Sequence, residues 1–454
     1  MSKFDRLGGD VTSDTCIIGG GIAGLWAAYK LVKAGQKVCV LEAARVASGV
    51  TAGSSAILTY AQDIIYTNLI KKHNVETARK YYEDSKDAII EIKEIVEKEK
   101  FKCDFEATNF VLFSNKLKGA RQLRKEEKAY RDMGYPILYA DVKVELPYKV
   151  KKVLKFDDAY QFDPLKLCGE LASYITKNGG QIFENTIVKN APKDNKLIVE
   201  TDKKHTVTAK NFIVATRFPF IVFPGFYFLK MYQSQNYSIA FKPKRNENIC
   251  ENTTFESVDE KGFEYRRVGE NILCDGVRVR TGQKPYKSKY RVLEKHLHRH
   301  FGEYKEITRF CAQDCITMDH LPYAGLYSGG AENVFVISGF NKWGMTNSYI
   351  TSGVVVDMVL GKLAPKAKFK DNIYTPQRND LFAGIIETIP HIGVVVASFW
   401  NRLFRRGPVC SHMGCKLKWN KDEQTWDCPC HGSRFDAKGQ IINNPAANPA
   451  EVIK

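Results

Sequence analysis

Four cysteines and two histidines lie close together near the C-terminal end of the chain. They form two short motifs, Cys410-Ser-His-Met-Gly-Cys415 and Cys428-Pro-Cys-His431. Thiolate and imidazole groups at such short spacings are ligands of zinc ions and of iron-sulfur clusters. A zinc site with two cysteines and two histidines would leave the other two cysteines without a role. The two motifs therefore favour an iron-sulfur cluster, and a zinc site is the alternative.

The two motifs resemble the ligand loops of Rieske [2Fe-2S] domains, over residues from about 405 to 450. In that family, two thiolates bind one iron and two imidazoles bind the other. The resemblance implies a disulfide between Cys415 and Cys430 that ties the two loops together. The cluster ligands that it implies are Cys410, His412, Cys428 and His431.

Two further positions bear on the reduction potential of such a cluster. Ser433 matches a serine whose hydroxyl donates to a cluster sulfur, whereas Phe435 stands where high-potential members of the family carry a tyrosine. Fewer hydrogen bonds to sulfur stabilise the reduced cluster less, so we expect a potential in the lower part of the Rieske range. The segment before Cys410 is also shorter than is usual in the family.

A second motif, near the N-terminal end, is typical of a dinucleotide-binding site. An apolar strand at 15–18 leads into Gly19-Gly-Gly-Ile-Ala-Gly24 and a helix that ends near Ala34, and a second strand at 37–41 ends at Glu42. The glycines allow a tight turn and a close approach to the pyrophosphate, which faces the helix N-terminus, and Glu42 can bind ribose hydroxyls. The expected contacts here are Gly19, Gly21, Ile22, Ala23, Gly24, Glu42, Ala43 and Arg45.

Further segments resemble the D-amino acid oxidase superfamily of flavoenzymes and favour FAD as the dinucleotide. They are the loop 49–56, the segments 184–188 and 211–216, and a strand, glycine and helix between 333 and 360. In that superfamily the N-terminus of this last helix points at the flavin and stabilises the charge that develops on reduction. The implied contacts are Thr51, Ser54, Ser55, Val188, Ala215, Thr216, Gly339, Gly344, Met345 and Thr346. No catalytic acid or base is assigned.

The elements around these motifs predict an α/β chain with three parts. Helical periodicity covers 75–100 and 117–133, and alternating apolar residues between 220 and 310 predict an antiparallel substrate sheet with turns at Asp275-Gly276 and Thr281-Gly282. We expect a Rossmann-like FAD-binding domain at about 1–100, 150–218 and 310–366, with a substrate domain at 101–149 and 219–309. A linker helix at 376–404 and a small all-β Rieske domain at 405–454 follow.

Net charge and cysteine content indicate which cellular compartment and which partners suit the protein. The formal net charge is +17, but basic and acidic residues alternate along the helices, which does not favour nucleic-acid binding. The charge favours a soluble, basic enzyme, and the alternative is that it attracts an acidic electron-transfer protein such as a ferredoxin or flavodoxin. Scattered cysteines and an N-terminus without an apolar run predict a cytoplasmic protein. Residues 384–404 are too interrupted to span a membrane, and the oligomeric state stays open.

Both ends together resemble a bacterial subgroup of FAD-dependent oxidoreductases that carries a C-terminal Rieske domain. The resemblance implies that a small amine or amino acid is oxidised at its C–N bond and that electrons leave the flavin through the cluster to an external acceptor. One alternative is the reverse flow, from a ferredoxin-like donor through the cluster to FAD. Another is a plain flavoenzyme with a structural Rieske-like tail.

Overall fold

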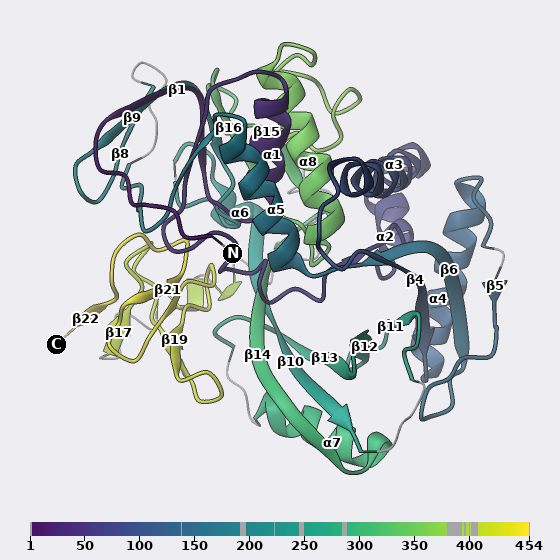
Figure 1. Ribbon diagram of the computed structural model, residues 1–454. Helices are drawn as coiled ribbons and strands as arrows, with labels where there is room; N and C mark the ends of the chain where they lie inside the picture. The colour runs from purple at the N-terminus through teal and green to yellow at the C-terminus, as the bar shows by residue number, and fades with distance from the viewer. Residues whose placement is uncertain are drawn as a thin grey trace.

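A computed structural model describes residues 2–137, 139–190, 197–221, 223–244, 249–283, 288–378, 393–394, 396–398, 400 and 407–453. The described chain forms two large sheets with their helices and a small C-terminal domain of residues 407–453 (Figure 1). Most of the linker helix expected at 376–404 lies outside the described residues. Within the described ranges, no helix is long and apolar enough to cross a membrane.

The first sheet contains the nucleotide-binding motif. Its strand order is β15 (Tyr323–Leu326), β16 (Val334–Ser338), β9 (Thr206–Val214), β1 (Val11–Ile18), β2 (Val38–Leu41) and β7 (Gln181–Phe183), with β8 (Ile198–Glu200) paired to β9. Strand β1 pairs in parallel with both β2 and β9. Parallel strands are covered on both faces, which explains why β2 and β16 are buried along their whole length.

Helices α1 (Ile22–Lys33), α5 (Pro164–Lys177) and α8 (Gly344–Val359) pack on this sheet (Figure 1). Helix α1 directly follows β1, as the glycine motif predicts. The rings of Trp26 on α1 and Tyr349 on α8 meet edge to face, with 4.9 Å between their centroids. Since α8 is the helix expected at the flavin, this contact fixes it relative to the nucleotide-binding helix.

The second sheet forms the part expected to bind substrate. Its strand order is β14 (Tyr304–Thr317), β10 (Met231–Pro243), β13 (Asn271–Arg280), β12 (Phe263–Val268), β11 (Thr253–Ser257), β4 (Glu106–Ser114), β6 (Lys152–Gln161) and β3 (Ile57–Leu58), with β5 (Tyr139–Ala140) paired to β6. All pairs are antiparallel except β11 with β4. Its surroundings include α2 (Ile65–Lys72), α3 (Val75–Glu99), α4 (Leu117–Asp132), α6 (Tyr227–Lys230) and α7 (Lys289–Phe301).

The helices predicted at 75–100 and 117–133 are confirmed as α3 and α4. The turn predicted at Asp275-Gly276 is wrong, because both residues lie inside β13 and pair with β10 and β12. Gly276 lies where the register of β10 shifts, so this glycine serves a strand irregularity instead of a turn. Strand β6 belongs to the second sheet although it falls in the 150–218 segment expected to bind FAD. The domain boundaries stay a prediction.

The C-terminal domain is built from two small antiparallel sheets. Strand β17 (Gly407–Val409) pairs with β22 (Glu451–Ile453), and β18 (Lys418–Asn420), β19 (Thr425–Asp427), β20 (Arg434–Phe435) and β21 (Ile441–Asn443) form the other sheet. Leu417, Phe435 and Ala446 form a small apolar core together with the four cysteines. Because this core is small, it contributes little to the free energy of unfolding, and cross-links between the loops contribute a larger share.

A buried ion pair includes Arg378, the last described residue before the gap at 379–392. Arg378 Nε lies 2.5 Å and Nη2 2.9 Å from the two carboxylate oxygens of Asp319, and both side chains are almost fully buried. Although burial opposes ionisation, Arg378 holds the pKa of Asp319 well below its usual value. The stabilisation is therefore present above the unfolded-state pKa of about 3.8 and is lost as the pH falls towards the lower folded-state pKa.

Replacing Arg378 with leucine is expected to lower the free energy of unfolding by about 3–5 kcal/mol, because the buried Asp319 carboxylate loses its partner. Urea unfolding at pH 7 measures the change. The control is Lys362→Met, which removes the partner of Asp357 from an exposed ion pair and should cost less than about 1 kcal/mol. Equal shifts in the two variants would contradict the prediction.

Candidate functional site

The turn after β1 and the first turn of α1 each contain a position that accepts only glycine. Gly19 has a positive φ of 114°, and a Cβ there would lie 2.5 Å from the carbonyl oxygen of Ala215. A Cβ on Gly24 would lie 2.0 Å from the carbonyl oxygen of Gly19. Gly21 is the N-cap of α1 and has no side chain to cap the helix, and Thr51 Oγ1 accepts a hydrogen bond from the N–H of Ile22 at 3.2 Å. The turn thus leaves the helix N-terminus able to receive a phosphate.

Glu42 lies next to this turn at the end of β2. Its carboxylate accepts hydrogen bonds from the backbone N–H groups of Gly20 and Ala44, each at 2.8 Å. Burial raises the pKa of Glu42. Arg45 Nε lies 3.6 Å from a carboxylate oxygen of Glu184, which places the expected adenosine-binding segment 184–188 beside this loop. The glycine turn, the helix N-terminus behind it and the acid together fit the pyrophosphate and ribose of a dinucleotide.

The loop between β16 and α8 is bound tightly to β14. Gly339 has a φ of 74°, and a Cβ there would lie 2.4 Å from Cγ2 of Thr317. The N–H of Asn341 donates to the carbonyl oxygen of Cys315 at 3.0 Å. Thr346 Oγ1 donates to the carbonyl oxygen of Thr59 at 3.1 Å, which joins α8 to the chain that follows the loop 49–56.

The N-terminus of α8 resembles that of α1. Its N-cap is Trp343, whose side chain accepts no capping hydrogen bond from the described residues, and the first turn carries no acidic residue. Met345 and Thr346 are buried. Such a helix end can stabilise the negative charge of a reduced flavin ring, as the sequence predicts.

A group of charged side chains lies beside this loop on the second sheet. Lys342 Nζ lies 3.5 Å from Glu256 and 3.7 Å from Asp63, and Arg278 Nη2 lies 3.0 Å from Glu256. Arg278 also pairs with Glu264. Burial raises the pKa of Glu256 and lowers that of Lys342. The group places paired charges of both signs beside the loop that leads into α8.

The other expected FAD contacts are placed on the same elements, and their roles stay predictions. Ser54 Oγ accepts a hydrogen bond from the N–H of Ala56, and Thr51 Oγ1 accepts one from the N–H of Ile22. Val188 pairs with Thr201 in an isolated bridge. Ala215 and Thr216 follow β9, where the N–H of Ala215 donates to the carbonyl oxygen of Ile18.

The expected cluster ligands come together in the C-terminal domain, on the loops between β17 and β18 and between β19 and β20. Cys410 and Cys428 are buried free cysteines, and the rings of His412 and His431 lie 5.1 Å apart. Nδ1 of His412 is buried and has no hydrogen-bond partner within the described chain. Two thiols and two imidazoles at one place fit a Rieske [2Fe-2S] cluster.

Electrostatics favour the ligand forms of Cys410 and His412, whereas the hydrogen bond with Cys410 raises the pKa of the Cys428 thiol. A hydrogen bond with Cys428 lowers the pKa of the Cys410 thiol to about 7, and backbone N–H groups in the same loop act in the same direction. Burial lowers the pKa of His412 to about 4. A thiol that ionises easily and a neutral imidazole are the protonation states that metal binding requires.

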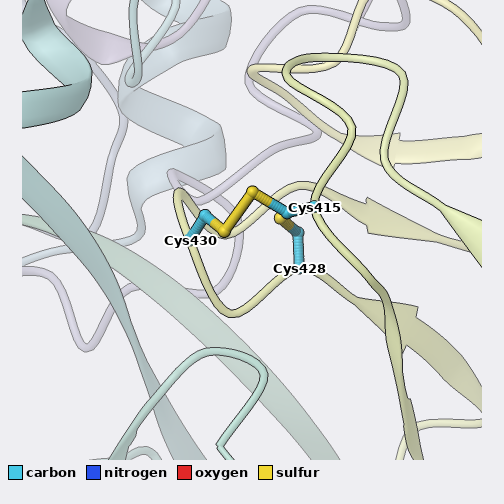
Figure 2. Close-up of side chains that lie close together, drawn as sticks. All are labelled: Cys415, Cys428 and Cys430. Carbon is cyan, nitrogen blue, oxygen red and sulfur yellow. A yellow bond between two sulfur atoms is a disulfide. The ribbon is translucent and has the colours of Figure 1, made fainter. Parts of the chain in front are cut away.

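The disulfide implied by the resemblance is confirmed. Cys415 and Cys430 are joined, with 6.6 Å between their Cα atoms, and Figure 2 shows this bond beside the sulfur of Cys428. These three sulfurs lie within 4.8 Å of one another, but only Cys428 remains free to bind a metal. The group of three is therefore not a separate metal site. Ser433 makes a side-chain hydrogen bond with Cys410, and its hydroxyl accepts from the N–H of Ala446 at 3.0 Å.

The second ligand loop docks onto the second sheet. Gln233 on β10 donates from Nε2 to the carbonyl oxygen of His431 at 2.7 Å, and Gln313 on β14 donates to that of Gly432 at 2.6 Å. A Cβ on Gly432, whose φ is 85°, would lie 2.5 Å from Cβ of Gln233. Only a glycine allows this approach, so the cluster loop and the sheet are in direct contact.

A second contact joins the C-terminal domain to the first sheet. The side-chain amide of Asn444 donates to the carbonyl oxygens of Thr216 at 2.5 Å and Phe218 at 2.6 Å. Arg217 Nη2 donates to Oδ1 of Asn444 at 3.0 Å, and Ser338, just before Gly339, donates to the carbonyl oxygen of Arg217. Sequence reasoning missed these contacts, because single glutamine, asparagine and arginine residues carry no readable signal for docking.

Comparison with known proteins agrees with both halves of the site. The family of FAD dependent oxidoreductases matches residues 14–358, and the Rieske [2Fe-2S] domain matches residues 388–454. A Bacillus subtilis (strain 168) protein named as a Rieske 2Fe-2S iron-sulfur protein, YhfW, is 30% identical over 100% of this chain and 96% of its own.

Two further proteins are similar over most of the chain. The gamma-glutamylputrescine oxidoreductase of Escherichia coli (strain K12) is 24% identical over 79% of this chain and 86% of its own. Glycine oxidase from Geobacillus kaustophilus is similar in structure, with a TM-score of 0.67 and 15% identity over 81% of this chain and 99% of its own. At that identity, the likeness to glycine oxidase shows the fold alone.

Proposed function

Because the chain belongs to the FAD dependent oxidoreductase family and carries a Rieske [2Fe-2S] domain, we propose that it oxidises the C–N bond of an amine or amino acid and sends the electrons through the cluster to an external acceptor. The substrate loses two electrons and two protons, and water hydrolyses the resulting imine. FAD supplies two-electron chemistry, and the cluster carries one electron at a time. The chain's own residues must hold both groups close together.

One observation carries this proposal: strand β14 borders both expected cofactor sites. The side chain of Gln313 donates to Gly432 in the cluster loop, and the carbonyl oxygen of Cys315 accepts from Asn341 in the loop before α8. Two residues of a strand span about 7 Å. The docked cluster loop and the flavin loop therefore meet across one short stretch of backbone, which favours electron transfer within the chain over a purely structural tail.

The charged group around Lys342 supports an amine or amino acid as substrate. Its carboxylates, Glu256 among them, can attract an ammonium group, and Arg278 can pair with a carboxylate. Gamma-glutamylputrescine oxidoreductase and glycine oxidase, named for an amine and an amino acid, share the family or the fold.

Every cysteine of the chain lies in a described range, and those outside the C-terminal domain are free. Free cysteines suit a reducing compartment, so we place the protein in the cytoplasm.

Cofactor content of the protein purified without oxygen tests the proposal. We expect about two irons and two acid-labile sulfides per FAD, and after dithionite reduction the EPR spectrum of a [2Fe-2S] cluster with mixed cysteine and histidine ligands. The measured potentials then give the direction of flow. A flavin potential below that of the cluster supports flow to an external acceptor, and one above it favours the reverse. FAD with zinc or without iron would overturn the proposal.

A further inference from the structure

The connection between β9 and β10 exposes large aromatic side chains. We call its described residues 218–221 and 223–228 the aromatic loop. Phe223 is 61% exposed and Phe226 is 43% exposed, and their ring centroids lie 5.2 Å apart. Phe228 lies 6.2 Å from Phe223 and 6.1 Å from Phe226. Exposed apolar side chains that gather in one patch, unlike scattered ones, mark a surface that binds something.

The exposed rings are held in place from below. Tyr227, between Phe226 and Phe228, is buried, and its hydroxyl donates to the carbonyl oxygen of Tyr327 at 2.9 Å. The hydroxyl of Tyr327 donates to the carbonyl oxygen of Ile221 at 2.6 Å. A Cβ on Gly225 would lie 2.4 Å from the ring of Tyr227, so the turn packs closely. A surface fixed in this way binds a partner with little loss of conformational entropy.

The aromatic loop also touches a cluster ligand. The ring of Phe228 meets that of His431 edge to face, with 5.7 Å between their centroids, and Phe218 lies 6.2 Å from His431. His431 itself is buried. A single ring, Phe228, therefore connects the exposed pair Phe223 and Phe226 to an imidazole expected to bind iron.

We propose that the aromatic loop is the docking surface for a small acidic electron-carrier protein, which exchanges one electron with the cluster in each encounter. This inference rests on the proposed function. No bond forms or breaks: one centre loses the electron that the other gains. Interfaces of transient redox complexes are small and have an apolar core within a charged rim, and the net charge of +17 attracts an acidic partner. The contact of Phe228 with His431 favours a redox partner over lipid, because a membrane anchor would need no contact with a cluster ligand.

The test is the rate at which a reduced acidic plant-type [2Fe-2S] ferredoxin reduces the cluster, followed by stopped flow. Such ferredoxins have lower potentials than Rieske centres, so the electron enters the cluster whichever way it flows in the cell. We expect the Phe223→Ser/Phe226→Ser variant to lower the second-order rate constant about tenfold, which corresponds to about 1.4 kcal/mol, because the side chains at the centre of an interface contribute most to binding. Added salt should lower the rate constant for reduction of the parent protein, because it screens the attraction between opposite charges.

Two controls separate docking from damage. Reduction by dithionite and the EPR spectrum should stay unchanged in the double variant, because both report the cluster alone. Leu117 lies on α4, far from the C-terminal domain (Figure 1), and is 65% exposed. Leu117→Ser removes an equally exposed apolar side chain and should leave the ferredoxin rate unchanged.

Three outcomes would overturn the inference. An unchanged ferredoxin rate in the double variant would show that the rings do not form the docking surface. The aromatic loop would be assigned to lipid if the parent protein sediments with phosphatidylglycerol vesicles, the double variant does not, and both have the same ferredoxin rate. A parent protein without a cluster signal would remove the proposed function, and this inference with it, whereas the first two outcomes leave the proposed function intact.

Discussion

Replacing Cys428 with serine is expected to remove the iron-sulfur cluster and to leave FAD bound. Cys428 is buried beside Cys410, and its two neighbouring sulfurs are tied up in the Cys415–Cys430 disulfide, so no other thiol can take its place. A Rieske cluster needs all four ligands, and a serine hydroxyl binds iron weakly at neutral pH. We expect iron and sulfide to fall to near background while the flavin absorbance of the purified protein is retained.

The matched control is Cys311→Ser. Cys311 is a free, half-buried cysteine on β14, outside both ligand loops. Its replacement should leave iron content and the EPR spectrum at the level of the parent. Full iron content in Cys428→Ser would show that the metal is held by other residues. Equal loss in both variants would point to general damage instead of a lost ligand.

The motifs that chemistry restricts most could be predicted from the sequence. The glycine turn, α1 and β2 follow one another within a short stretch, and local backbone preferences determine each of them. Cys410, His412, Cys428 and His431 lie on two short loops of one small domain, and their role as cluster ligands stays a prediction. In both cases the signal lies in residue types that few other roles explain.

Contacts between distant segments could not be predicted. Asp275-Gly276 has the composition of a turn, but pairing on both sides keeps it within β13. Gln233 and Gln313 are ordinary strand residues until the cluster loop packs on them. Tertiary packing decides such positions, and it outweighs local propensity.

The aromatic loop gives a third example. Its sequence is apolar, and Pro219, Pro224 and Gly225 indicate a turn but not which aromatic rings face outward. In the structure Tyr227 points into the core, whereas Phe223 and Phe226 stay exposed. Which side chains face outward depends on a turn whose packing involves Tyr327, about a hundred residues away in the chain.

Replacing Gly24 with alanine is expected to weaken FAD binding, so that FAD is lost on dilution, and to leave the cluster in place. The new Cβ would lie 2.0 Å from the carbonyl oxygen of Gly19, which is backbone and cannot rotate away, and 3.2 Å from Cγ2 of Ile17. The turn must open, at a cost of about 1–3 kcal/mol for an overpacked site. Since the same turn must approach the pyrophosphate, we expect FAD affinity to fall about 10- to 100-fold. Titration of the apoprotein with FAD, followed by flavin fluorescence, measures it.

Gly330→Ala is the matched control, because Gly330 lies between β15 and β16, outside the expected FAD contacts, and a Cβ there meets no atom of the described chain within 4 Å. This variant should bind FAD as the parent does, and equal affinity in Gly24→Ala would contradict the close approach of α1 to the turn.

Together, Gly24→Ala and Cys428→Ser remove one cofactor each from the same chain. If β14 joins the two sites, photoreduction of FAD reduces the cluster in the parent protein at a rate independent of protein concentration. A mixture of the two variants should then transfer electrons only at a rate that rises with concentration, because neither chain holds both centres.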